Sequence, residues 1–297
     1  MFDFNNKKEP PLCGGTDRSF DKNAPRTILS EDMTLFKVTS ELPSAMNIDR
    51  QDGETIDYIS AFAAPASEGT FIFLETESRY FKNGNKRSLA YVKENVFPSL
   101  AALTREQDLA ANNGRHSFTH GLPQNFGGAI DIRYASGEKI SISSNQSPVI
   151  SGQTGEKIAA LFTKAINGEK VYLPDVENLK EIRFVEERKN GGFTRAALSI
   201  NDDGSGSMTR SRRFSDPKIY NNEKSFSADE ITAIKKNISD CGIFAWSTLP
   251  ECSYPFDDEK SLTFIFKDGS EITVPKDREL PDQIKGGFFN IELELTK

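Results

Sequence analysis

The sequence IDIRYASGEKISI at residues 130–142 returns, position for position, as LTFIFKDGSEITV at residues 262–274. In both stretches apolar and polar residues alternate, stop at Ser-Gly or Asp-Gly, and then alternate again. Alternation with a period of two is typical of a strand with one buried face, and glycine supplies the positive φ that a tight turn requires. Each stretch therefore predicts a β-hairpin, and the pair indicates an internal duplication.

A predicted helix precedes each hairpin. The first covers Pro98–Gly114, because proline favours the first helical turn and glycine favours the end of a helix. The second covers residues 228–240, where Ser227 and Glu230 have the spacing of a capping box. Each half of the chain thus has the order β-β-α-β-β, which predicts a mostly antiparallel sheet with one helix on one face.

The expected fold class is α+β, with two related lobes that arise from internal duplication, each a mostly antiparallel sheet covered by one amphipathic helix. The expected domains are a flexible leader at residues 1–30, a first lobe at 31–150, a helical linker at 151–175 and a second lobe at 176–297. The linker contains apolar residues at helical spacing between residues 158 and 166. Alternating apolar residues between 288 and 295 predict a final strand.

This plan resembles that of uncharacterised bacterial proteins in which a strand-rich unit with an xDGxxIxI hairpin recurs. The resemblance depends on the hairpins at 130–142 and 262–274 and on the helices that flank them, about 200 residues in all. It implies a duplicated β-β-α-β-β unit and no particular activity.

The composition excludes several classes of protein. The chain has 297 residues, a formal net charge of -7 and 36% hydrophobic residues, so nucleic acid is not the expected partner. No apolar run approaches the length of a membrane span, and the expected location is cytoplasmic. The chain has three cysteines, Cys13, Cys241 and Cys252, which are too few for a disulfide framework. No cofactor motif is present, so no cofactor is expected.

His116 and His120 are the only histidines in the sequence. On a helix their spacing of four would place both imidazoles on one face, where they can bind zinc or transfer protons. Gly114 is expected to end the helix before them, and no Glu follows His116 as in HExxH. Histidines in a loop or at the surface are the competing interpretation.

Two other patterns are open to a binding interpretation. Gly-Gly pairs at 127–128, 191–192 and 286–287 each precede a predicted strand, where they favour an entry turn or bulge over a phosphate loop. Arg210, Arg212 and Arg213 form a basic patch, interpreted as a solvated strand edge or turn.

Trp246 is the only tryptophan, and Phe244 lies two residues before it. Both are candidates for a binding surface, because aromatic residues dominate such surfaces. The competing interpretation places Trp246 in the core between helix and sheet.

The sequence contains no recognisable catalytic motif. We therefore expect a non-enzymatic binding or interaction module with a protein or peptide partner, which can add a strand to an exposed edge strand of this protein. The alternative is a metal-dependent hydrolase that uses His116 and His120.

Overall fold

The computed structural model describes residues 15–42, 56–78, 85–121, 126–214, 217–252 and 259–297. Cys13 lies outside this part of the chain. The chain forms two compact units. Unit 1 comprises Met1–Ala63, Ile72–Ser88 and Asn95–Asn167, and unit 2 comprises Ala64–Phe71, Leu89–Glu94 and Gly168–Lys297.

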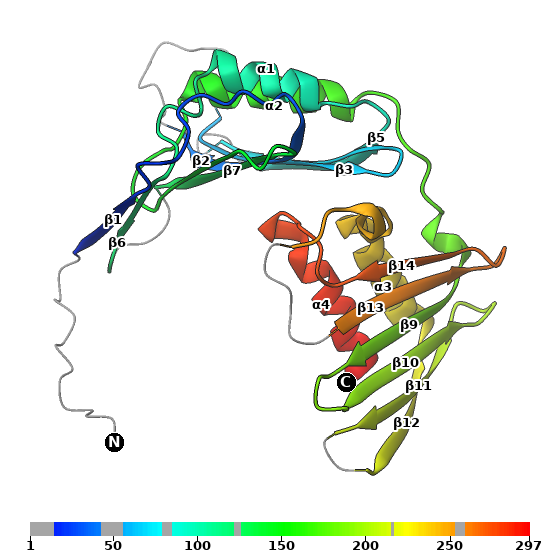
Figure 1. Cartoon of the computed structure of the whole chain (residues 1–297). Coiled ribbons are helices and arrows are strands. Elements are labelled where there is room, and N and C mark those ends of the chain that lie inside the picture. The colour runs from blue at the N-terminus through cyan, green and yellow to red at the C-terminus, as the bar shows by residue number, and fades with distance from the viewer. Residues whose placement is uncertain (1–14, 43–55, 79–84, 122–125, 215–216, 253–258) are drawn as a thin grey trace, which may run out of the picture. The chain divides into compact units, whose positions relative to one another are not determined.

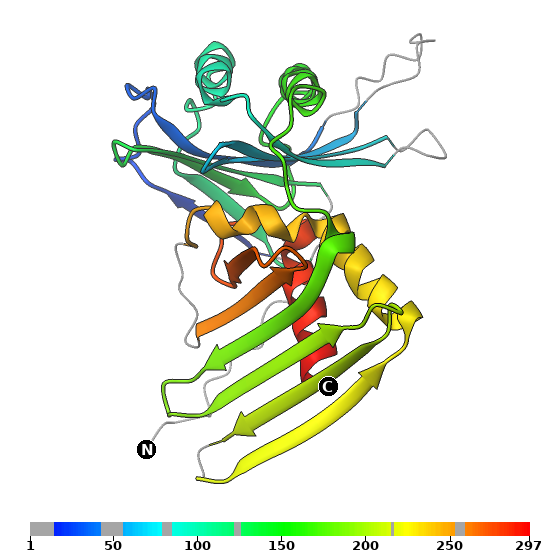
Figure 2. The same cartoon turned by 90° about the vertical axis from the view of Figure 1, so that its right-hand side faces the viewer.

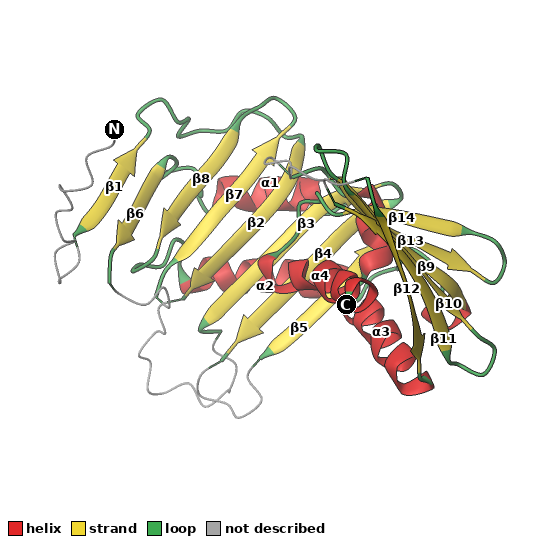
Figure 3. Ribbon diagram, turned by 90° about the horizontal axis from the view of Figure 1, so that it is seen from below, coloured by secondary structure: helices red, strands yellow, loops and turns green. Residues whose placement is uncertain are grey.

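Most of unit 1 is an eight-stranded sheet with two helices on one face (Figures 1 and 3). In sheet order the strands are β1 (Thr16–Phe20), β6 (Arg115–Thr119), β8 (Lys139–Ser144), β7 (Gly128–Tyr134), β2 (Met33–Glu41), β3 (Tyr58–Ala66), β4 (Gly69–Glu77) and β5 (Lys86–Val92). The helices are α1 (Phe97–Glu106) and α2 (Gly152–Ile166). Phe162 of α2 packs on Phe36 of β2, with ring centroids 5.9 Å apart.

Unit 2 contains a six-stranded sheet whose neighbouring strands are all antiparallel (Figure 2). In sheet order the strands are β12 (Ile219–Phe226), β11 (Gly206–Arg213), β10 (Phe193–Ile200), β9 (Leu179–Glu187), β13 (Glu259–Phe266) and β14 (Glu271–Pro275). The helices are η1 (Val176–Asn178), α3 (Ala228–Cys241), η2 (Ile243–Thr248) and α4 (Asp282–Thr296). The fold class is therefore α+β with two sheets rich in antiparallel pairs.

The two predicted hairpins are confirmed as β7–β8 and β13–β14. Their turns have the same geometry, because Gly137 and Gly269 both have a φ of 86°. The same two hydrogen bonds close each turn: Gly137 N–H donates to the Tyr134 carbonyl and Gly269 N–H to the Phe266 carbonyl, both at 3.0 Å. The second bond joins Tyr134 and Glu138 in one hairpin and the equivalent residues in the other.

Six strands of the first sheet follow the same order as the six strands of the second. The orders are β5-β4-β3-β2-β7-β8 and β12-β11-β10-β9-β13-β14. Counted along the chain, an α-helix follows the fourth of these strands (β5 or β12) and the sixth (β8 or β14) in both cases. The first sheet has two further strands, β1 and β6, without a counterpart in the second sheet. Figure 3 shows them beyond β8 at one edge of the sheet.

The sequence predicts one helix for each lobe, but the described residues of each unit contain two α-helices. The predicted linker helix is α2, which packs within unit 1. The predicted final strand at 288–295 is wrong, because these residues lie in α4. Phe288, Ile291 and Leu295 are buried, whereas Phe289 is 54% exposed. Their spacing of three and four is helical, and alternation is only a second pattern in the same residues.

Two further boundaries differ from expectation. Within the expected flexible leader, Thr16–Phe20 forms β1, whose side chains are all exposed and which pairs with β6 through the main chain. The helix expected to end at Gly114 ends at Glu106, and turns follow it. Gly114 has a φ of 78° at the start of β6. Among the described residues, no helix has both the length and the apolar character needed to cross a membrane.

Candidate functional site

The two histidines lie in a strand and just beyond its end, and they do not meet. His116 is in β6, and His120 follows the end of that strand. A strand rises about 3.3 Å per residue, so positions four apart share a face but are separated by about 13 Å. His116 Nδ1 lies 2.8 Å from Ser143 Oγ, and His120 Nε2 lies 2.7 Å from Asp17 Oδ2. Each imidazole therefore has its own partner.

The described residues contain no group of three or more His, Cys, Asp and Glu side chains placed to bind a metal ion. The His116–Ser143 distance is that of a nucleophile and its base. In the described part of the chain, however, no carboxylate hydrogen-bonds to His116 to orient the imidazole. A Ser-His-Asp arrangement is therefore not assembled there.

Trp246 and Phe244 lie in the core of unit 2. Trp246 is 1% exposed, and its indole N–H donates to the Cys241 carbonyl at 3.1 Å. The Phe244 ring makes edge contacts with Phe264 and Phe266, at centroid distances of 5.1 and 5.2 Å. Both side chains therefore join η2 to the sheet and leave little aromatic surface for a ligand.

Packing in the core of unit 2 accounts for the glycine at 287 and for the unreactive thiol of Cys241. Gly287 lies in α4, where an added Cβ would come within 2.7 Å of Cys241 Sγ and within 3.4 Å of Trp246. Burial raises the pKa of the Cys241 thiol to about 12, so this thiol is not a nucleophile at neutral pH. Gly286–Gly287 permits close helix packing and does not introduce a strand.

A row of polar side chains crosses four strands of unit 2 on the face that carries the helices. In the register of the sheet, Arg212, Thr194, Glu186 and Lys260 stand opposite one another on neighbouring strands. The Thr194 hydroxyl donates to Glu186 at 3.0 Å, and Lys260 Nζ lies 2.9 Å from the same carboxylate. The row stands beside buried apolar residues of the same face, such as Phe184 and Leu262.

Lys260 joins this row to α4. Its ammonium lies 2.6 Å from Glu292 of the helix, and Arg188 lies 2.6 Å from Glu186. Burial alone would raise the pKa of Glu186, but hydrogen bonds from Lys260, Thr194 and Arg188 outweigh it and lower that pKa. Burial opposes the charge of Lys260, and the two carboxylates outweigh it and raise its pKa. Glu186 and Lys260 are thus both held in their charged forms.

The predicted basic patch has a structural role. Arg210 and Arg212 both donate to the Thr296 carbonyl at the last turn of α4, where carbonyls have no partner within the helix. Arg213 donates to the Gly191 carbonyl at 3.0 Å. These arginines therefore fix a helix end and a turn of unit 2, which a strand pattern alone does not predict.

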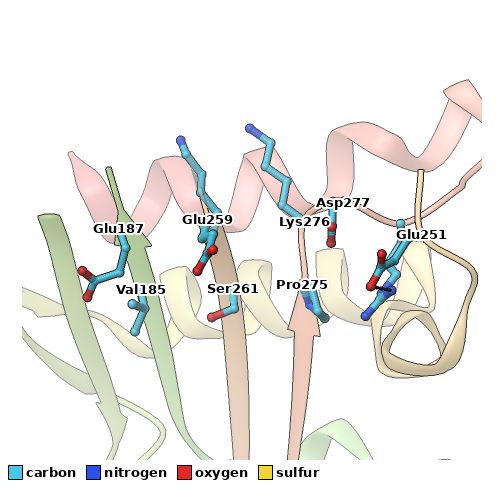
Figure 4. Close-up of a pocket in the computed structure, with 10 residues that line it drawn as sticks. Val185, Glu187, Glu251, Glu259, Ser261, Pro275, Lys276 and Asp277 are labelled. Carbon is cyan, nitrogen blue, oxygen red and sulfur yellow. Dashed lines mark ion pairs between the residues drawn. The ribbon is translucent and has the colours of Figure 1, made fainter. Parts of the chain in front are cut away.

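A pocket of about 430 Å³ opens beside the row, where β9 and β14 end and β13 begins (Figure 4). We call it the charged pocket. Its lining residues are Val185, Glu187, Glu251, Glu259, Lys260, Ser261, Pro275, Lys276, Asp277 and Arg278. Most of its charged side chains form ion pairs, either within the pocket or with a neighbouring residue. Arg278 lies 3.6 Å from Glu251, and Glu187 lies 2.7 Å from Arg195. A ligand charge would have to displace these partners.

A second pocket, of about 490 Å³, lies in unit 1 where β1 and β6 extend the sheet beyond β8. We call it the serine pocket. Its lining residues are Arg18, Ser19, Phe20, Asn112, Arg115, His116, Ser117, Ile142, Ser143, Ser144, Ser147, Pro148 and Val149.

The register of the strands sorts these residues onto two faces. Arg18 is opposite Ser117, which is opposite Ser144, and Phe20 is opposite Arg115. Side chains that stand opposite one another share a face, and successive ones alternate. Arg18, Phe20, Arg115, Ser117 and Ser144 therefore share one face of the strands, and Ser19, His116 and Ser143 occupy the other.

Two buried asparagines hold β6 against β8. The Asn145 side chain donates to the Thr119 carbonyl at 2.9 Å and accepts from the Thr119 N–H at 2.8 Å, as a neighbouring strand would. The Asn113 side chain donates to the Lys139 carbonyl at 2.7 Å and accepts from the Ser141 N–H at 2.8 Å. The pairing of β6 with β8, which covers only two residues, is thereby extended at both ends.

The electrostatic character of the serine pocket differs from that of the chain. Two arginines, a histidine, an asparagine and five serines line it, and the described lining contains no carboxylate, although the chain has 44 acidic residues. In the described residues no ion pair involves Arg18 or Arg115. The Arg115 guanidinium lies 5.6 Å from the centre of the Phe20 ring, which restrains its position.

The sequence did not single out this pocket, apart from His116. β1 has no apolar alternation, and its pairing with β6 joins residues about a hundred positions apart. The only local signal is the run of hydroxyl residues around Ser143, which is not specific.

No protein-family model matches the chain, and no curated protein is significantly similar to it in sequence.

Proposed function

We propose that this protein is a non-enzymatic binding module and that its ligand is an anion held in the serine pocket. The observation that carries the proposal is that Arg18 and Arg115 lie in a pocket without a carboxylate, in a strongly acidic chain. Guanidinium groups bind carboxylates and phosphates with paired hydrogen bonds, and serine hydroxyls add donors. The charged pocket is a poorer candidate, because its arginine and its buried lysine already have acidic partners.

A proposed origin of the fold by duplication also favours the serine pocket as the functional site. We propose that the two units descend from one duplicated ancestor, since their strand orders and hairpin turns correspond. β1 and β6 then form an addition to the first copy, and the serine pocket forms at this addition. Functional sites are commonly built onto a scaffold in this way.

The metal-dependent hydrolase is the weaker proposal. It requires His116 and His120 to share a ligand, but His116 lies in β6 and His120 lies just beyond its end, about 13 Å away at the rise of an extended chain. Each already contacts a separate partner, Ser143 or Asp17.

The test is a titration of the whole chain with inorganic phosphate, followed by two-dimensional ¹H–¹⁵N NMR. We expect saturable shift changes at Arg115–Thr119 and at residues 142–149. The variant with both Arg18→Ala and Arg115→Ala is expected to bind at least about tenfold more weakly, because each charged hydrogen bond contributes about 1.5–3 kcal/mol.

The matched control replaces Arg183 and Arg195 by alanine. Both are exposed arginines on strands of unit 2, with side chains 51% and 59% exposed. Their loss removes the same net charge and is expected to leave phosphate binding within about twofold. Shifts that do not saturate, or equal affinity in the two double variants, would overturn the proposal.

A further inference from the structure

The serine pocket is larger than a simple oxyanion requires. Its volume is about 490 Å³, whereas one water molecule occupies about 30 Å³ of the liquid. A phosphate ion has five non-hydrogen atoms and would therefore fill roughly a third of that space at the density of water. The remaining space must hold either water or another part of the ligand.

One wall of the pocket is apolar. Ile142, Pro148 and Val149 line it together. Ile142 shares its strand face with Ser144, as residues two apart do, and this is the face of Arg18 and Arg115. The apolar wall and the arginines therefore border one space.

The loop that carries Pro148 and Val149 is fixed before any ligand arrives. The Val149 N–H donates to the buried Ser40 hydroxyl at 3.1 Å. At the other end of the loop, the Ser147 N–H donates to Ser144 Oγ at 3.1 Å. Proline at 148 restricts the main chain further. A preformed apolar wall binds a ligand without an additional cost of ordering.

We propose, resting on the anion site described above, that the ligand is a small organic anion. Its charged group lies at Arg18 and Arg115, and its apolar body lies against Ile142, Pro148 and Val149. Aryl and alkyl phosphates and carboxylates share this chemistry. Pockets for such ligands are commonly apolar with a few placed polar groups.

The test compares three probes on the whole chain by NMR titration: phenyl phosphate, inorganic phosphate and phenol. We expect phenyl phosphate to bind about tenfold more tightly than inorganic phosphate, because the ring removes apolar surface from water. Phenol is expected to bind at least tenfold more weakly than phenyl phosphate, because it lacks the dianion.

A substitution separates the two parts of the pocket. Val149→Ser is expected to weaken phenyl phosphate three- to tenfold and to leave inorganic phosphate within twofold. The control Val185→Ser, in the charged pocket, is expected to change neither.

The possible failures are distinguishable. If neither anion shows binding that depends on Arg18 and Arg115, the anion site itself is wrong. If both anions bind there with equal affinity, or if Val149→Ser weakens both equally, the anion site stands and the organic ligand is wrong.

Discussion

Lys260 is the residue on which the charged network of unit 2 depends. Its ammonium contacts Glu186 of β9 and Glu292 of α4, and all three side chains are largely buried, at 16%, 8% and 11% exposure. Charges taken out of water are tolerated only when they are paired and hydrogen-bonded. The arrangement therefore joins sheet and helix, and the removal of Lys260 leaves two buried carboxylates with one cation fewer to balance them.

We predict that Lys260→Met destabilises the protein by about 3–5 kcal/mol, because it leaves two buried carboxylates without their common partner. Urea denaturation followed by circular dichroism measures this loss. The control is Lys236→Met, which removes an ion pair on the exposed face of α3, where the lysine side chain is 71% exposed. It is expected to cost less than about 0.5 kcal/mol. Similar losses in the two variants would contradict the network.

Glu186 makes the stability depend on pH in the acid range. Its pKa in the folded protein lies below the ordinary value of 4.5. Its stabilising contribution is therefore complete above about pH 4.5 and is lost as the pH falls through the folded pKa.

We predict that Glu186→Gln destabilises the protein at pH 7 and that the difference from the wild type shrinks below pH 4.5. Urea denaturation between pH 2.5 and pH 7 measures this difference. Glu223→Gln, on the exposed strand β12, serves as the control and is expected to show little difference at any pH. A difference for Glu186→Gln that is independent of pH would exclude this explanation.

At the scale of elements, the two hairpins are the clearest repeated structure. Gly137 and Gly269 have the same φ of 86°, and nothing lies within 4 Å of a Cβ added at either one. Any effect of a substitution there must come from the main-chain conformation, because there is no atom to clash with.

We predict that Gly137→Ala and Gly269→Ala destabilise the protein equally, by about 1–2 kcal/mol each, the cost of a left-handed conformation for an L-residue. Thermal denaturation of the two variants measures both. Gly286→Ala is the control, because Gly286 lies in a helix with open space around it. It is expected to stabilise by about 0.5–1 kcal/mol. Unequal losses at the two turns would show that the hairpins are not equivalent.

The hairpins were predictable because their signals are local. Alternation and a Ser-Gly or Asp-Gly turn lie within thirteen residues. The capping box of Ser227 and Glu230 was predictable for the same reason, and the structure contains both of its hydrogen bonds. α4 was not, because its residues 288–295 satisfy two periods at once, and the burial of Phe288, Ile291 and Leu295 in the folded unit distinguishes the helical one.

The serine pocket was not predictable from the sequence. It requires β1, which has five exposed side chains and no apolar pattern, to pair with β6. It also requires Asn113 and Asn145 to hold β6 against β8. These contacts join segments far apart in the chain, and neither composition nor periodicity reports them.

At the scale of the whole molecule, each sheet has a central strand and weakly held edges. In unit 2, β9 pairs on both sides, with β10 and β13, whereas β12 pairs only with β11 among the described strands. In the first sheet β1 pairs only with β6. Amide hydrogens in central strands become accessible to exchange only when the whole unit unfolds. Those in edge strands become accessible through local unfolding.

We predict that the amides of β9 and β2 exchange with deuterium most slowly and that those of β1 and β12 exchange fastest. Hydrogen–deuterium exchange with mass spectrometry, performed on the full chain, measures this order. Protection of β1 or β12 equal to that of β9 would contradict the description of them as edges.

The walls of the serine pocket come from three separate stretches of chain, at residues 18–20, 112–117 and 142–149. Any compound that occupies the pocket gains affinity only while all three are assembled, so occupancy must stabilise β1 against local opening. Resistance of Thr16–Phe20 to a protease therefore reports occupancy without any knowledge of the compound. Mixtures of metabolites can be screened on this basis alone.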